Sequence, residues 1–128
     1  MSKYRTLVVD DTEIIRRILI HILGQTEFEV VGEAVCGSDA VQKFEELSPD
    51  LVLMDIIMPG VDGIEAARQI LQRDPAARVV MCTAVGEETV LQRAMGVGAS
   101  HFIMKPFVAG DVLQVLRGLV AQDREEGA

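Results

Sequence analysis

Two kinds of hydrophobic pattern alternate along the chain. Short apolar runs rich in β-branched residues have the length and composition of strands buried on both faces. Between them, apolar residues recur every three or four positions, which is typical of amphipathic helices. The pattern predicts five strands and five helices in alternation. The runs are residues 5–9, 28–34, 50–54, 78–82 and 101–104, and the apolar stripes are Ile14, Ile18 and Ile22 with Ile15, Leu19 and Leu23; Val41, Phe44 and Leu47; Ile64, Ala67 and Leu71; Val90, Ala94 and Val97; and Val112, Leu116, Leu119 and Val120.

Regular alternation of strands and helices favours parallel strands joined by right-handed crossovers. The predicted fold class is therefore α/β, with a doubly wound parallel sheet covered by helices on both faces in three layers. Ser38 is expected to cap the second helix, and Gly24 and Gly98 to lie near helix ends. We place one domain at residues 1–122 and expect the polar residues 123–128 to form a frayed tail.

Length and charge narrow the possible functions. The chain has 128 residues, the size of one domain, and its 12 basic and 20 acidic residues give a net charge of −8. The basic residues are scattered, so we expect no direct binding of nucleic acid. No apolar stretch approaches the roughly 20 residues of a membrane span, and we expect a cytoplasmic protein without a membrane contact. Cys36 and Cys82 lack metal-ligand spacing and are expected to stay reduced.

Candidate chemistry lies where the predicted strands end. In a parallel sheet these ends share one edge, where ligands bind. The residues at the ends are Asp10, Asp11, Asp55, Thr83 and Lys105. Three neighbouring carboxylates repel one another unless one of them takes up a proton or a cation joins them, and all-oxygen ligands that leave room for water suit Mg²⁺. An ammonium and a hydroxyl are suitable donors for phosphoryl oxygens. The set predicts phosphoryl transfer onto a carboxylate.

The same residues carry a family resemblance. The segments TLVVDD, GEAVCGSDAV, PDLVLMDIIMPGVDGIEAARQI, VVMCTA and GASHFIMKPF span nearly the whole chain. Their paired acids, the MD–MPG–DG element, the hydroxyl after the fourth strand and the KPF tripeptide stand at the spacing of response-regulator receiver domains. The chain resembles this family, and among its members the single-domain chemotaxis regulators most. The resemblance implies a flavodoxin-like sheet with strand order 2-1-3-4-5.

The resemblance also implies a role for each acid. Asp55 corresponds to the aspartate that accepts a phosphoryl group from the phosphohistidine of a histidine kinase. Asp11 and Asp55 are expected to bind Mg²⁺ directly, Asp10 largely through water, and the backbone carbonyl of Ile57 completes the protein ligands. On this interpretation the protein is not an enzyme, beyond catalysing its own phosphorylation and dephosphorylation.

The remaining positions imply a switch. Lys105 would neutralise one phosphoryl oxygen and Thr83 would donate a hydrogen bond to another, so that Asp55, Lys105 and Thr83 are the catalytic set. Phe102 occupies the family's aromatic switch position and is expected to move inward with Thr83. Lys105-Pro106 corresponds to the family's cis peptide bond. We expect a monomer whose downstream target is a protein, the flagellar motor switch if the chemotaxis likeness extends to output.

Other interpretations of these residues stay open from the sequence alone. Asp10, Asp11 or Thr12 is able to cap the first helix, and Asp55 is able to form a structural ion pair with Lys105. A stand-alone receiver of another phosphorelay, or a receiver cut from a longer regulator, has the same motifs.

Two rival protein classes fit less well. A haloacid-dehalogenase phosphatase carries its nucleophile in a D-x-D motif after the first strand, and this chain has D-D there. A flavodoxin-like electron carrier holds a flavin phosphate after the first strand, where Asp10 and Asp11 repel it.

Three apolar residues depart from the commonest family pattern. Ile57 and Val85 each lie two positions after a site residue, where many family members carry polar side chains. Apolar flanks provide no group to orient a hydrolytic water, so we expect slow self-dephosphorylation. Phe102 replaces the commoner Tyr and lacks its hydroxyl.

Overall fold

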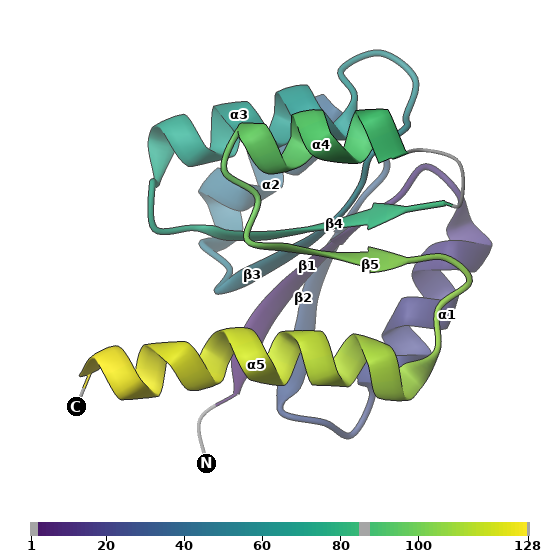
Figure 1. Cartoon of the computed structure of the whole chain (residues 1–128). Helices are drawn as coiled ribbons and strands as arrows, with labels where there is room; N and C mark the ends of the chain where they lie inside the picture. Colours follow the sequence, from purple (N-terminus) through teal and green to yellow (C-terminus); the bar gives the residue numbers. More distant parts are fainter. Residues whose placement is uncertain (1–2, 85–87, 128) are drawn as a thin grey trace.

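The computed structural model describes residues 3–84 and 88–127. Within these residues five strands and five helices alternate, as the hydrophobic pattern predicts (Figure 1). The strands are β1 (Tyr4–Val9), β2 (Phe28–Ala34), β3 (Leu51–Asp55), β4 (Arg78–Thr83) and β5 (His101–Met104). The helices are α1 (Glu13–Leu23), α2 (Gly37–Leu47), α3 (Gly63–Arg73), α4 (Glu88–Gly96) and α5 (Ala109–Gly127).

The five strands form one parallel sheet in the order β2-β1-β3-β4-β5, which confirms the predicted topology. Helices α2, α3 and α4 cover one face and helices α1 and α5 cover the other (Figure 1). Because β3 lies at the centre and is covered on both sides, its residues Leu51 to Met54 are all fully buried. The unbroken apolar run of β3 reflects this position, since neither of its faces meets water.

The apolar residues of α1 are only partly buried, which corrects the expectation of a single core-facing stripe. Leu19 and Leu23 are buried against the sheet, whereas Ile14 is 66% exposed and Ile18 is 40% exposed. A helix beside one sheet face buries about one side of its circumference. Ile14 and Ile18 therefore face solvent, whereas Ile22 in the same column packs against the core.

The helix ends differ in part from the sequence expectations. Cys36, not Ser38, is the N-cap residue of α2, and Ser38 lies inside its first turn. Helix α5 extends to Gly127, and the expected polar tail at residues 123–128 stays a prediction. Gly24 follows α1 directly and Gly98 adopts a positive φ of 108° just after α4, as expected for glycines near helix ends. None of the helices in the described ranges combines the length and apolarity of a membrane span.

Candidate functional site

The carboxyl ends of the strands bring the predicted site residues to one edge of the sheet. Asp10 follows β1, Asp55 and Thr83 are the last residues of β3 and β4, and Lys105 follows β5 directly. Neighbouring strands are in register there, because Asp55 pairs with Cys82 and Thr83 with Met104. The backbone N–H of Lys105 also donates to the carbonyl of Thr83 at 2.7 Å. Parallel pairing therefore determines which residues meet.

Asp10, Asp11 and Asp55 form a carboxylate cluster. One oxygen atom from each lies within 4.8 Å of the others. Asp10 is 1% exposed and Asp55 is 6% exposed, whereas Asp11 is open to solvent. Hard oxygen donors, two of them buried and one at the surface, fit a small divalent cation that keeps part of its water shell. The three acids predicted from the sequence are therefore able to hold such an ion together.

Lys105 is the ammonium group beside this cluster. Its Nζ lies 3.1 Å from Oδ1 of Asp55 and 3.2 Å from Oδ2 of Asp10. The ion pair between Lys105 and Asp55 exists, as the structural interpretation of these residues required, but it is shared with a second acid. One ammonium against three carboxylates leaves the cluster with excess negative charge.

The charge imbalance is reflected in the acid strength of Asp55. Burial of the carboxyl group, followed by the negative charge of Asp10, raises the pKa of Asp55 to about 6, and the attraction of Lys105 offsets only part of this rise. Burial alone would lower the pKa of Lys105, but the charges of Asp55 and Asp10 outweigh it and raise that pKa. An added cation would favour the ionised carboxylate, so the site in this state is energetically suited to receive one.

The backbone after Asp55 is tightly packed. A Cβ atom at Gly63 would lie 2.0 Å from the carbonyl oxygen of Asp55, so only glycine fits there. The N–H of Gly63 donates to the carbonyl of Ile56 at 2.8 Å, and the N–H of Ile56 donates to Cys82 at 3.2 Å. Gly60 adopts a positive φ of 74° in the same connection. These contacts hold the connection from β3 to α3 close behind the carboxylate.

The other predicted positions lie on or next to the last two strands, or follow β3. Thr83 is 2% exposed, and the Lys105-Pro106 peptide bond is cis, as predicted. Phe102 is half-buried on β5, where it packs against the core on the α2, α3 and α4 side. Ile57 is 55% exposed. Val85 lies outside the described residues, so the expectation of slow self-dephosphorylation stays a prediction.

The alternative roles of nearby residues are resolved by local geometry. Thr12 is the N-cap residue of α1, but its side chain makes no capping hydrogen bond, and Oδ1 of Asp10 instead accepts the N–H of Thr12 at 2.8 Å. Cys36 and Cys82 are both free, as predicted. Burial raises the pKa of the Cys82 thiol to about 12, which keeps it protonated and unreactive.

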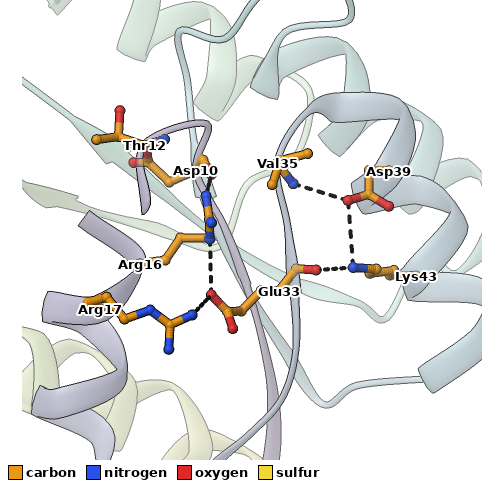
Figure 2. Close-up of polar contacts among 8 residues, drawn as sticks. All are labelled: Asp10, Thr12, Arg16, Arg17, Glu33, Val35, Asp39 and Lys43. Carbon is orange, nitrogen blue, oxygen red and sulfur yellow. Dashed lines mark hydrogen bonds and ion pairs between the residues drawn. The ribbon is translucent and has the colours of Figure 1, made fainter. Parts of the chain in front are cut away.

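Sequence reasoning missed one residue that contacts the site. Arg16 lies between Asp10 and Glu33, and hydrogen-bonds to both (Figure 2). In the sequence Arg16 and Arg17 are an undifferentiated basic pair. The position of Arg16 could have indicated this contact. A long side chain in the first turn of a helix is able to reach back to the backbone of an acid that precedes the helix.

Fold and site together define a class of protein. The chain belongs to the response regulator receiver domain family, whose profile matches residues 6–117. It is thus a response regulator of two-component signal transduction, a class that receives its phosphoryl group from a histidine kinase and acts on a downstream target.

The particular proteins that it resembles are chemotaxis proteins CheY. The chain is 47% identical over 113 residues to CheY of Bacillus subtilis, and 45% identical over 112 residues to CheY of Listeria monocytogenes. Each alignment covers 88% of this chain and 94% of the relative. Among solved structures, a chain of the CheX-CheY-BeF3-Mg complex from Borrelia burgdorferi superposes with a TM-score of 0.87 at 32% identity, covering 93% of this chain and 90% of that chain.

Proposed function

We propose that this protein is a CheY-like chemotaxis regulator that accepts a phosphoryl group on Asp55. The observation that carries the proposal is the contact set of Asp55, a buried carboxylate beside two further acids and held at 3.1 Å by Lys105. With a pKa of about 6, Asp55 is mostly ionised at neutral pH and is able to act as a nucleophile.

The proposed reaction transfers one phosphoryl group between two side chains. A carboxylate oxygen of Asp55 attacks the phosphorus atom of the kinase's phosphohistidine, the phosphorus–nitrogen bond breaks, and the electron pair returns to the imidazole, which takes up a proton. Lys105 and Thr83 stabilise the charge that develops on the phosphoryl oxygens. The products are an aspartyl phosphate and a free histidine, so the protein catalyses its own modification.

The metal centre in this proposal consists of Asp10, Asp11, Asp55 and the backbone carbonyl of Ile57. The donor set is all oxygen, which favours Mg²⁺ over softer metals. When bound, Mg²⁺ would neutralise charge shared by the carboxylates and the incoming phosphoryl group. Asp11 and Asp55 are assigned as direct ligands and Asp10 as a ligand through water. This assignment agrees with the two donors that already occupy the oxygens of Asp10.

The output step is proposed to be a population switch. A phosphoryl group adds about −1.5 to −2 charges beside Lys105, and Thr83 turns toward it. Phe102, half-buried on the edge strand β5, then moves into the space that Thr83 leaves. For this change to matter, phosphorylation must favour the active conformation by a few kcal/mol.

The downstream partner is proposed to be the flagellar motor switch, because relatives at 45% and 47% identity are chemotaxis proteins. We propose a monomeric receiver at residues 1–122 that acts in the cytoplasm, where the two free cysteines would stay reduced. A receiver of a non-chemotaxis phosphorelay is the alternative. Swarming of a CheY-deficient Bacillus subtilis strain that expresses this chain distinguishes the two partners.

The central test is site-specific phosphorylation. Wild-type protein, Asp55→Asn and the control Asp50→Asn are incubated with Mg²⁺ and acetyl phosphate and examined by intact-mass spectrometry. We expect one added phosphoryl group on the wild type and on the Asp50 variant, and none on the Asp55 variant. Equal labelling of all three proteins, or labelling that persists in EDTA, would contradict the assignment.

A further inference from the structure

Arg16 connects the backbone of the acid cluster to a charged group on the neighbouring strand. Its Nη1 donates to the carbonyl oxygen of Asp10 at 2.8 Å, and its Nε donates to Oε1 of Glu33 at 3.0 Å (Figure 2). The Arg16 side chain therefore connects helix α1 to the residue that follows β1 and to the strand β2. Its side chain is only 11% exposed, so these contacts are shielded from water.

The carbonyl that Arg16 holds belongs to the peptide group between Asp10 and Asp11. Orienting this carbonyl fixes the plane of that peptide, and with it the direction in which the Asp11 side chain leaves the backbone. Asp10 itself is held at its other polar groups, because its N–H donates to Ala34 at 3.1 Å and its carboxylate accepts from Thr12 and Lys105. Asp11 is exposed and has no comparable contacts of its own among the described residues. Its orientation therefore depends on the peptide plane.

Glu33 provides the fixed end of this connection. It lies on β2 opposite Val8 of β1, so sheet pairing determines its position. Its carboxylate also accepts from Arg17 at 2.6 Å, and its backbone carbonyl accepts from Lys43 of α2 (Figure 2). Although burial acts to raise the pKa of Glu33, hydrogen bonds from Arg16 and Arg17 hold it below the usual value, so the anchor stays charged.

We propose that Arg16 is a positioning residue of the phosphorylation site, which orients the peptide between Asp10 and Asp11 so that Asp11 faces the cation. The proposal rests on the proposed function, since it concerns the same metal centre. It adds a residue outside the acid, lysine and threonine set. Groups that orient metal ligands from behind typically change metal affinity about 10- to 100-fold when they are removed.

The proposal predicts that removing the Arg16 guanidinium weakens Mg²⁺ binding, whereas charge repulsion alone predicts that binding becomes tighter. A guanidinium near three carboxylates repels an incoming cation, so removing its charge alone would strengthen Mg²⁺ binding. Loss of orientation would weaken it. A purely structural role for Arg16 would lower the stability of the fold and leave the affinity unchanged. The direction of the change in Mg²⁺ affinity therefore separates the three cases.

Arg17 provides a matched control. It is the next residue of α1, carries the same charge and contacts the same oxygen of Glu33. Its side chain is 54% exposed, and among the described residues it contacts Glu33 alone. Arg16→Gln and Arg17→Gln each remove one charge and one contact with Glu33. Only the first removes the hydrogen bond to Asp10.

The experiment measures the Mg²⁺ dissociation constant of the whole chain by isothermal titration calorimetry at fixed ionic strength. We expect Arg16→Gln to weaken binding about tenfold and Arg17→Gln to change it less than twofold. The Mg²⁺ concentration for half-maximal labelling by acetyl phosphate should rise by the same factor in Arg16→Gln, with the maximal rate within about threefold of wild type. In the NMR spectrum of the metal-free protein, the Asp11 amide resonance should shift relative to wild type in Arg16→Gln. It should keep its wild-type position in Arg17→Gln.

Unchanged or tighter Mg²⁺ binding by folded Arg16→Gln overturns the proposal, and so does equal weakening in both variants. If Arg16→Gln does not fold, Arg16→Lys takes its place, because it keeps the charge but lacks the separate nitrogens that reach Asp10 and Glu33. Weakening of about threefold or more is then the supporting result, and wild-type affinity overturns the proposal. Failure of wild-type protein to bind Mg²⁺ or to accept a phosphoryl group refutes the proposed function itself. Wild-type affinity in Arg16→Gln refutes only the proposed role of Arg16 and leaves the proposed function intact.

Discussion

Charged side chains are arranged differently at the two ends of the sheet. At the carboxyl end, Asp10 and Asp55 are buried and face one another and Asp11, with the single ammonium of Lys105 between them. At the amino end, Asp50 is exposed, and its carboxylate accepts the backbone N–H of Arg5 at 2.8 Å.

Cations at the amino end also meet backbone acceptors. The guanidinium of Arg5 donates to the carbonyl groups of Leu47 and Ser48 at the end of α2, and Arg78 donates to the carbonyl of Asp50 at 3.2 Å. The two contacts of Arg5 satisfy carbonyls at the end of α2 that have no partner within the helix.

The difference separates a structural from a functional use of charge. At the amino end, the side chains of Arg5, Asp50 and Arg78 form hydrogen bonds with backbone groups of the same chain. At the carboxyl end the acids exceed their partners, and burial raises the pKa of Asp55. Such an arrangement lowers the stability of the free protein and is relieved when a cation binds.

The largest expected effect comes from removing Lys105. Lys105→Met leaves the buried carboxylates without their ammonium, and we expect the free energy of unfolding in EDTA to fall by about 2 to 3 kcal/mol. Urea denaturation followed by circular dichroism measures this change. The matched control at the amino end is Arg73→Met, which breaks the exposed ion pair with Glu45 and should cost less than about 1 kcal/mol. Equal losses in the two variants would remove the distinction between the ends.

A smaller effect concerns pH. Because the pKa of Asp55 in the folded protein, about 6, lies above its value of roughly 4 in an unfolded chain, the associated stability is fully present below pH 4 and is lost as the pH rises through 6. In EDTA, wild-type protein should gain about 1.5 kcal/mol between pH 8 and pH 5 relative to Asp55→Asn.

The pH experiment has an internal control. Urea denaturation of both proteins at several pH values gives the difference, which cancels the titration of groups that they share. Saturating Mg²⁺ should abolish it, because the cation stabilises the ionised carboxylate. If the free energy of unfolding of the two proteins in EDTA changes with pH in parallel, the pKa of Asp55 is not raised in the metal-free protein.

The smallest expected effect is at the amino end itself. Asp50→Ala removes an exposed acceptor of one backbone N–H and should cost about 0.5 to 1 kcal/mol at any pH between 5 and 8. It should leave the Mg²⁺ dissociation constant and the rate of labelling by acetyl phosphate unchanged. A change in either quantity would show that the two ends are coupled through the sheet.

Much of the fold followed from local pattern. The run that includes Leu51 to Met54 predicts a strand covered on both faces, and the structure places β3 at the centre of the sheet. The pattern was weaker where two apolar columns share one helix, because periodicity does not say which column faces the core. Ile14 and Ile18 are exposed for this reason. Ser38 is not the cap of α2, since short polar residues are common within first turns as well as before them.

The sequence by itself determined which chemical groups stand at the strand ends, because chain direction in a parallel sheet sends Asp10, Asp55 and Lys105 to the same edge. Only the tertiary structure decided how these groups meet. Strand order and register set the burial of Asp55 and Asp10, the sharing of Lys105 between them, and the contact of Arg16 with the Asp10 carbonyl. The physical reason is that charge energies depend on distance and burial, which are relations between distant segments that no local pattern records.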